Sequence, residues 1–185
     1  MKHYIIFLDS GDTLVDESTE VRDDTQTVIH SQLFDGAKEL VQNLKRDGYR
    51  IALVADGTVA SFDNIYREQD MEQVFEYRSI SEQVGHEKPH PAMFLTAMEG
   101  MNLSEEDRSR IIMVGNNLKR DIVGANRQGF TSILMGQSPR YCMTPQCPEE
   151  VPDYVASCPK EVYDIVCFLE SQYENREKIL KSCKG

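Results

Sequence analysis

The chain has 185 residues, of which 40% are hydrophobic, so it is long enough for one domain with a core of its own. Its 31 acidic and 20 basic residues give a net charge of −11, which argues against nonspecific binding to nucleic acid or to an anionic membrane. No apolar run approaches the roughly 20 residues of a membrane span, and the run at residues 4–8 is too short for a secretory signal. We therefore expect a cytoplasmic protein that binds neither nucleic acid nor membranes.

Hydrophobic patterns predict strands and helices in alternation. Continuous apolar runs, typical of buried strands, occupy residues 4–8, 50–55, 111–114 and 131–135, with shorter candidates at 78–80 and 154–156. Apolar residues at helical spacing predict helices at residues 35–46, 59–68, 91–99, 118–128 and 161–181. Residues 136–153 are rich in proline and polar residues, which predicts a loop.

Local signals indicate where several helices begin and end. Asp35 is placed to cap the N-terminus of the first helix, and Gly48 to end it. Pro91 suits the first turn of a helix that Gly100 would end, and Gly129 follows the helix at residues 118–128. These signals predict short connections between the elements.

Five cysteines lie in the last third of the chain: Cys142, Cys147, Cys158, Cys167 and Cys183. An odd number without a secretory signal argues against a disulfide framework. The spacing of the first two is too wide for a CxxC zinc knuckle. We expect reduced, partly buried thiols.

Alternating strands and helices with short connections predict an α/β fold, namely a Rossmann-like doubly wound parallel sheet with helices on both faces. We expect a single domain over residues 1–185. In such a sheet ligands bind beyond the carboxyl ends of the strands, so the residues after each strand are candidates for a functional site. These candidates are Asp9, Asp12, Ala55, Asp56, Gly57 and Asn116, with Asp121 one turn further on and Lys88 in a loop before a helix.

Three of these residues, Asp9, Lys88 and Asp121, suit phosphoryl transfer. An aspartate can attack phosphorus and form a covalent intermediate. A lysine can neutralise the phosphoryl group. Mg2+ needs only one or two protein carboxylates because it keeps several of its waters. The three residues together therefore predict a Mg2+ site that binds a phosphorylated substrate.

Four segments in order along the chain, FLDSGDTLVD, LVADG, HEKPHPAMF and VGNNLKRD, resemble the motifs of the haloacid dehalogenase (HAD) superfamily. The resemblance covers nearly the whole chain. It implies that Asp9 is the nucleophile and that Lys88 contacts the phosphoryl group. It also implies that Mg2+ is held by Asp9, the main-chain carbonyl of Gly11, Asn116 and Asp121.

The second segment, LVADG, resembles the phosphate-binding turn of the family. The main-chain NH groups near Asp56 and Gly57 would bind phosphoryl oxygens there. Ala55 stands where the family has threonine or serine, so one hydroxyl is missing. A hydrogen bond of that kind contributes roughly 0.5–1.5 kcal/mol.

Two other positions depart from the family pattern. Gly11 stands two residues after the nucleophile, where the family has its general acid and base, so the side chain that protonates the leaving group is missing. Asp12, one residue further on, is a candidate replacement if the loop turns it towards the site. Asn116 replaces an acid and brings an oxygen without charge. We expect aryl or acyl phosphates to be hydrolysed well and alkyl phosphates poorly, because alkyl leaving groups need a proton.

The segments between the motifs are short. Residues 17–34 have room for a small flap, with a hairpin over residues 19–31, but not for a full cap domain. A site without a cap cannot enclose a small substrate by itself. It suits a bulky phosphorylated substrate, such as a protein, or an oligomer whose neighbouring subunit covers the site.

Two functions stay open from the sequence. The first is a HAD-like hydrolase, a Mg2+-dependent phosphatase that acts through an aspartyl-phosphate on Asp9. The second is a weak or inactive member that binds a phosphorylated ligand or a partner protein, since Gly11, Ala55 and Asn116 each remove a useful group. A dehalogenase is less favoured because that class usually carries a cap. A dinucleotide enzyme is less favoured because LDSGDT lacks the GxGxxG pattern.

Overall fold

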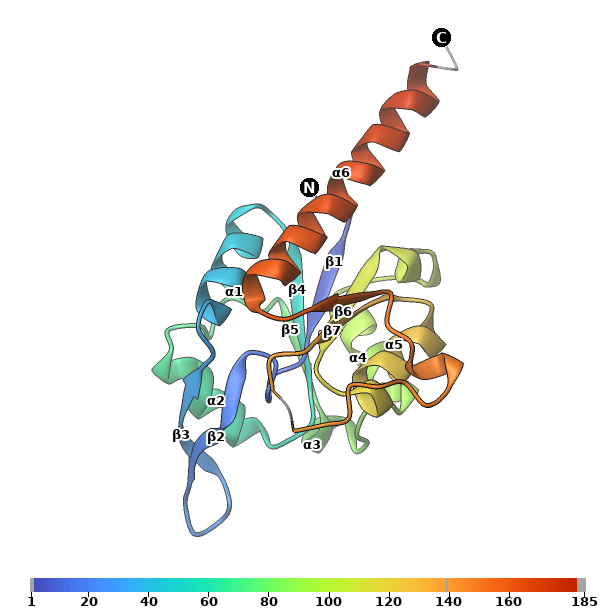
Figure 1. Cartoon of the computed structure of the whole chain (residues 1–185). Helices are drawn as coiled ribbons and strands as arrows, with labels where there is room; N and C mark the ends of the chain where they lie inside the picture. The colour runs from blue at the N-terminus through green and yellow to red at the C-terminus, as the bar shows by residue number, and fades with distance from the viewer. Residues whose placement is uncertain (1, 139, 183–185) are drawn as a thin grey trace.

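The computed structural model describes residues 2–138 and 140–182, and its centre is a six-stranded parallel sheet (Figure 1). From one edge to the other, the strands are β5 (Tyr77–Ile80), β4 (Arg50–Ala55), β1 (Ile5–Leu8), β6 (Ile111–Gly115), β7 (Thr131–Met135) and β8 (Tyr154–Ala156). The chain starts in the middle of the sheet, builds one side, and then crosses β1 to build the other. The predicted doubly wound α/β fold is confirmed.

Helices cover both faces of the sheet because successive residues of a strand point to opposite sides. Ile6 and Leu8 of β1 belong to a core that contains residues of α1 (Ala37–Arg46), α2 (Val59–Glu68) and α6 (Pro159–Ser182). Ile5 and Phe7 belong to the opposite core, under α4 (Pro91–Gly100) and α5 (Val123–Gln128). Burial on both sides explains why β1 reads as an unbroken apolar run.

Two helix ends differ from the prediction. Gly36, with a φ of 81°, occupies the position before α1 and makes no side-chain cap, so the predicted capping by Asp35 is wrong. The last residue of α4 is Gly100 and its C-cap is Met101, so Gly100 lies inside the helix and does not follow it as predicted. A Cβ atom on Gly100 would lie 2.2 Å from the ring of Tyr77, so this glycine is required by close packing.

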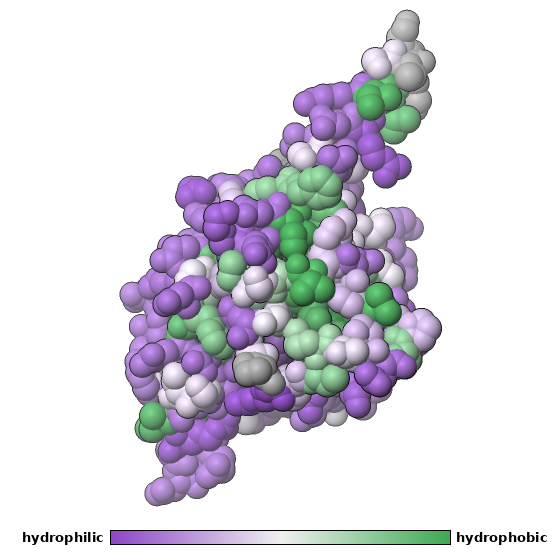
Figure 2. Space-filling view, in the orientation of Figure 1, coloured by the Kyte–Doolittle hydropathy of each residue, from purple (hydrophilic) through white to green (hydrophobic). Residues whose placement is uncertain are grey.

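A β-hairpin extends from the sheet at the point where β1 ends. It consists of β2 (Val15–Arg22) and β3 (Val28–Leu33), which pair antiparallel, and it starts earlier than predicted. Hydrogen bonds hold it on α2: Val28 N donates to Ser61 Oγ (3.0 Å), Asn64 Nδ2 donates to Val28 O (2.9 Å), and His30 Nδ1 lies 2.6 Å from Glu68 Oε1. Figure 1 shows the hairpin projecting from the body, and Figure 2 shows polar side chains covering its tip. Its role as a flap stays a prediction.

The exposed surface bears on two sequence predictions. Within the described ranges, no helix combines the length and apolarity needed to cross a membrane. In Figure 2 apolar side chains gather over β8 and the start of α6, on the face turned to the viewer.

Cys142 and Cys147 are exposed and Cys158 and Cys167 are half-buried, and all four are free thiols. The predicted partial burial thus holds for the second pair, and Cys183 lies outside the described residues.

The α6 helix is tied to the beginning of β1 by Glu170. This carboxylate is 5% exposed, and it accepts hydrogen bonds from His3 N (2.9 Å) and Tyr4 N (3.3 Å). The bonds satisfy two main-chain donors that lie before the first residue of the strand. Figure 1 shows that α6 continues beyond this point, away from the body.

Replacement of Glu170 by alanine is expected to lower the free energy of unfolding by about 2 kcal/mol, because two partly buried main-chain NH groups lose a charged acceptor. Glu174→Ala, an exposed position on the same helix, is the matched control and should change it by less than about 0.5 kcal/mol. Urea denaturation measures both. Equal midpoints for the two variants would contradict this role of Glu170.

Candidate active site

The site lies where three neighbouring strands end. Asp9 follows β1, Asp56 follows β4 and Asn116 follows β6, and these strands are adjacent in the sheet. Lys88 comes from the loop between α3 (Ser81–Val84) and α4, and its peptide bond to Pro89 is cis. Residues that are up to 107 positions apart in sequence therefore meet at one edge, as the parallel topology predicts.

At the centre of the site, Lys88 bridges two carboxylates. Its Nζ lies 2.6 Å from Asp9 Oδ1 and 2.7 Å from Asp121 Oδ1. All three residues are buried, with 4%, 7% and 1% of the surfaces of Lys88, Asp9 and Asp121 exposed. Burial by itself would lower the pKa of Lys88, but Asp121 and Asp9 outweigh that effect and raise it. The lysine therefore stays protonated. Burial raises the pKa of the Asp121 carboxyl to about 7 although Lys88 opposes the rise, so the full charge of Asp121 is present only above neutral pH.

Asp121 is held in place by the turn that carries it. That turn is η2 (Leu118–Ile122), a π-helical turn that leads into α5, where the sequence predicted one continuous helix. Asp121 Oδ2 accepts a hydrogen bond from Asn117 N (3.0 Å). A Cβ atom on Gly115 would lie 2.2 Å from Asp121 Cγ, so the glycine after β6 makes room for this carboxylate.

The Asp56 side chain positions the loop that carries Lys88. Asp56 Oδ1 accepts a hydrogen bond from Lys88 N (2.9 Å), and its Oδ2 accepts one from Arg120 (3.1 Å). The N–H of Gly57 donates to Ser81 Oγ (2.9 Å), so it is already engaged. The predicted binding of phosphate by the NH groups near Asp56 and Gly57 stays a proposal, and in this structure Gly57 would have to release Ser81 to take part.

Thr13 was not identified from the sequence, yet it contacts the predicted nucleophile. Its Oγ1 donates a hydrogen bond to Asp9 Oδ2 (3.0 Å), and the residue is fully buried. Asp9 thus has one oxygen on Lys88 and the other on Thr13, which holds its carboxylate in a single orientation. The signal was present in LDSGDT, where a threonine follows the aspartate within one tight turn.

Asp12, the predicted replacement for the missing acid, lies in a different environment. Its φ is 51°, and its side chain lines a groove with Gln137 and Arg140 that does not include Asp9 or Lys88. Arg140 Nε lies 2.8 Å from Asp12 Oδ2, an ion-pair distance, although the N–H direction falls outside hydrogen-bond geometry. Asp12 Oδ1 accepts a weak bond from Glu17 N (3.3 Å). This placement does not favour Asp12 as the proton donor.

Glu17 on β2 is a second residue that the sequence did not single out. Its Oε1 lies 1.7 Å from the position that a Cβ atom on Gly11 would occupy. Burial raises the pKa of the Glu17 carboxyl, while Arg140, which pairs with its other oxygen, opposes the rise. The carboxyl group of Glu17 thus takes the space beside Gly11 that a side chain at position 11 would fill.

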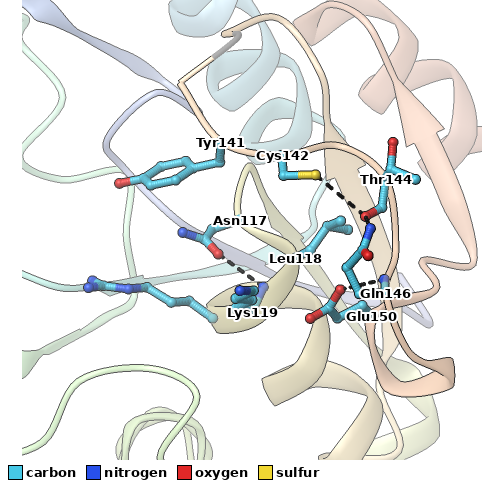
Figure 3. Close-up of a pocket in the computed structure, with 9 residues that line it drawn as sticks. Asn117, Leu118, Lys119, Tyr141, Cys142, Thr144, Gln146 and Glu150 are labelled. Atoms are coloured by element: carbon cyan, nitrogen blue, oxygen red, sulfur yellow. Dashed lines mark hydrogen bonds between the residues drawn. The ribbon is translucent and has the colours of Figure 1, made fainter.

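Two adjoining hollows surround these groups. The smaller, about 50 Å3, is lined by Asp9, Gly11, Glu17, Asp56, Lys88, Asn116, Asn117, Arg120, Asp121 and Tyr141, and we call it the Asp9 hollow. The larger, about 410 Å3, shares Asn117, Arg120 and Tyr141 with it, and we call it the side pocket. Figure 3 shows the side pocket between Tyr141 and Cys142 of the loop and Asn117 and Leu118 at the start of η2.

The Asp9 hollow fits a hard divalent cation. Asp9 and Asp121 supply two carboxyl groups to one lysine, and a cation beside them would stabilise both in the ionised form. Asn116 is 3% exposed, and its Nδ2 has no hydrogen-bond partner, so rotation of the amide could present its oxygen instead. No group of three or more His, Cys, Asp or Glu side chains within residues 2–138 and 140–182 is placed to bind a metal, so a cage of protein ligands is not present there.

A comparison with models of known protein families identifies the family of the chain. Residues 5–129 match the model of the haloacid dehalogenase-like hydrolases, a match that covers more than half of the chain and includes Asp9, Lys88 and Asp121. The chain belongs to this family. The predicted resemblance is therefore confirmed. Three of the four motifs fall at the ends of β1, β4 and β6, and the fourth, which carries Lys88, lies in the loop before α4.

Curated relatives of the chain are phosphatases. A glyceraldehyde 3-phosphate phosphatase of Methanopyrus kandleri is 29% identical over 127 residues, which are 68% of this chain and 53% of that protein. Its counterpart in Pyrococcus furiosus is 33% identical over 99 residues, 53% of this chain and 40% of that protein. The pyrophosphatase PpaX of Bacillus mycoides is 29% identical over 102 residues, 55% of this chain and 46% of that protein. The chain spans about half the length of these relatives.

Solved structures of similar size share the fold. An uncharacterised protein from Listeria monocytogenes superposes with a TM-score of 0.72 at 22% identity, covering 91% of this chain and 99% of that chain. A HAD-superfamily hydrolase from Ehrlichia chaffeensis also reaches 0.72, at 18% identity, covering 91% and 98%. At such low identity these similarities establish the fold alone.

Proposed function

We propose that this HAD-like protein is a Mg2+-dependent phosphatase that forms an aspartyl-phosphate on Asp9. The observation that carries the proposal is the buried cluster in which Lys88 bridges Asp9 and Asp121. A buried lysine between two carboxylates at the ends of parallel strands suits the binding of a phosphoryl group next to a nucleophile. The family match and the phosphatase relatives support the same reaction class.

In the proposed reaction the Asp9 carboxylate attacks phosphorus and the bond to the leaving-group oxygen breaks. Thr13 holds Asp9 in orientation, and Lys88 offsets negative charge on the phosphoryl oxygens. Mg2+, held by Asp9, Asp121, the Asn116 oxygen and the Gly11 carbonyl, would neutralise further phosphoryl charge. Water then attacks the aspartyl-phosphate, releasing phosphate and restoring Asp9.

The side pocket suggests where the rest of the substrate lies. It shares Asn117, Arg120 and Tyr141 with the Asp9 hollow and has room, about 410 Å3, for a small leaving group. Tyr141 and Leu118 offer apolar contact there, and Lys119 and Arg120 offer positive charge (Figure 3). We therefore favour a small phosphorylated molecule, of the kind that the curated relatives are named for, over the macromolecular substrate predicted from the missing cap. A neighbouring subunit over the site stays a prediction.

The second function, a binding protein without turnover, is favoured by the altered groups. Ala55 offers no hydroxyl, and Asn116 offers no charge to a cation. Purified protein that hydrolyses no ester of a broad phosphate panel, yet binds inorganic phosphate or Mg2+ in calorimetry, would favour this second function.

Removal of divalent cations is expected to lower turnover of p-nitrophenyl phosphate by roughly 100-fold or more, because the phosphoryl charge would lose its counter-ion. The measurement is a rate assay on protein treated with EDTA, followed by addition of Mg2+, which should restore the rate. Unchanged turnover in EDTA would contradict the metal requirement, and the same protein assayed with Ca2+ tests whether the site demands the smaller ion.

A further inference from the structure

The proposed reaction needs a proton donor that position 11 does not supply. When an alkyl phosphate is cleaved, the leaving oxygen departs as an alkoxide unless an acid protonates it. Gly11 has no side chain to do so, and Asp12 lies outside the Asp9 hollow. The donor must therefore come from another residue of that hollow.

The carboxylates of the hollow are Asp9, Asp56, Asp121 and Glu17, and three of them are committed. Asp9 is the nucleophile of the proposed reaction. Both oxygens of Asp121 accept hydrogen bonds, one from the side chain of Lys88 and the other from the main-chain N–H of Asn117. Asp56 holds the main chain of Lys88 and the Arg120 side chain. Glu17 alone among these four is not committed on both oxygens.

The two oxygens of Glu17 have different surroundings. Oε2 pairs with Arg140, which anchors the side chain from the loop that follows β7. Oε1 is turned towards Gly11, 1.7 Å from where a Cβ atom would be, and Glu17 Cδ lies 2.7 Å from the same point. The side chain is 30% exposed, so it reaches both the hollow and its mouth. The absence of a side chain at position 11 is what makes room for it.

We propose that Glu17 is the general acid and base of this site, reaching from β2 into the space that Gly11 leaves open. The inference rests on the proposed phosphatase function. In the first step Asp9 forms a bond to phosphorus, the bond from phosphorus to the leaving oxygen breaks, and the Glu17 carboxylic acid gives its proton to that oxygen. In the second step the Glu17 carboxylate takes a proton from water as the water oxygen attacks phosphorus, and Asp9 is released.

This assignment changes the expected substrate range. With no acid the chain should hydrolyse aryl phosphates and leave alkyl phosphates almost untouched. With Glu17 in place, the wild-type protein should hydrolyse both. Tyr141, which also lines the hollow, is the competing donor because its hydroxyl carries a proton.

The first test compares kcat/KM for p-nitrophenyl phosphate and for an alkyl phosphate such as glycerol 3-phosphate, in the presence of Mg2+. Glu17→Gln should lower the alkyl value by roughly 100-fold or more and the aryl value by less than about tenfold, since the nitrophenolate needs no proton. Equal losses on both esters would overturn the proposal. A selective alkyl loss in Tyr141→Phe that is absent in Glu17→Gln would assign the proton to Tyr141 and would also overturn it.

The second test moves the acid back to position 11. Gly11 does not have a positive φ, and Glu17→Ala removes the three atoms that lie nearest to a new Cβ, so we expect aspartate to be accommodated there. Glu17→Ala combined with Gly11→Asp should regain at least about a tenth of the alkyl turnover that Glu17→Ala loses. Glu17→Ala with Gly11→Asn, equal in size but without a proton to give, should regain none. Recovery in both double variants would show that Glu17 only fills space.

The outcomes separate this inference from the function on which it rests. Wild-type protein that hydrolyses p-nitrophenyl phosphate but not glycerol 3-phosphate would refute Glu17 as the acid and keep the phosphatase. Wild-type protein inactive on both esters and on acyl phosphate would refute the phosphatase itself, and with it the role of Glu17. The aryl rate of each variant also reports that the variant is folded.

Discussion

Replacement of Asp9 by asparagine is expected to lower phosphatase turnover by roughly 10⁴-fold or more, because an amide has no anionic oxygen to attack phosphorus. The fold should survive. Lys88 keeps its contact with Asp121, and the replacement removes one of the two carboxyl groups that share this lysine. The free energy of unfolding should therefore stay within about 1 kcal/mol of the wild-type value.

The measurement is a steady-state rate with an aryl phosphate, together with thermal unfolding of the same sample. Asp24→Asn, at the exposed tip of the hairpin and away from both hollows, is the matched control and should keep the full rate. Acid-quenched wild-type protein should carry phosphate on the peptide that contains Asp9. An asparagine variant with a tenth or more of the wild-type rate would exclude Asp9 as the nucleophile.

Loss of the Lys88 ammonium group should be the most damaging single change for stability. Lys88→Met keeps most of the side-chain volume but leaves Asp9 and Asp121 facing each other without a counter-charge, at 7% and 1% exposure. Breaking a buried ion pair from one side costs about 3–5 kcal/mol. Turnover should fall as well, because the phosphoryl group loses its cation.

The pH dependence of the Lys88→Met variant gives a second readout. Burial raises the pKa of the Asp121 carboxyl to about 7 in the wild type, and Lys88 opposes that rise. Without Lys88 the pKa of Asp121 should rise further, so the folded state of the variant binds more protons than the unfolded state. By linkage the stability of the variant should rise as the pH falls from about 7 to about 5. In the wild type Lys88 stays charged over that range and opposes the rise in the pKa of Asp121, so the gain in stability should be smaller than in the variant.

Urea denaturation at both pH values measures the two effects, with Lys45→Met as the control. Lys45 is exposed near the end of α1, and its replacement should change the free energy of unfolding by less than about 0.5 kcal/mol. If Lys88→Met were as stable as Lys45→Met at neutral pH, the buried cluster would not be paired in solution as it is in the structure.

Much of the site was predictable because it depends on topology. Buried parallel strands are recognisable as apolar runs, and their carboxyl ends must lie along one edge. Asp9, Asn116 and Asp121 could therefore be grouped before their positions were known. Lys88 was grouped with them as a residue of a loop before a helix, the HEKPHPAMF segment supported that grouping, and the structure places all four around one hollow.

The parts that could not be predicted depend on the direction of side chains. Asp12 stands next to Gly11 in sequence, yet a positive φ turns its carboxylate into another groove. Glu17 is six positions from Gly11, yet the hairpin brings its carboxyl back beside it. The hairpin reverses the direction of the chain, so a residue of β2 can lie beside the turn that precedes it. The residue pattern does not predict which carboxylate of the hairpin lies beside the site.

By itself, the sequence determined the alternating α/β architecture, the family and the three charged residues at its centre, because the burial pattern and the succession of strands and helices along the chain follow from residue type and spacing. The tertiary structure alone decided which groups these residues contact. It placed Lys88 between two carboxylates, gave Asp9 the hydroxyl of Thr13 and occupied the space beside Gly11 with Glu17. These contacts join segments that are distant in the chain or related by a turn, so their geometry exists only once the sheet and the hairpin have packed together.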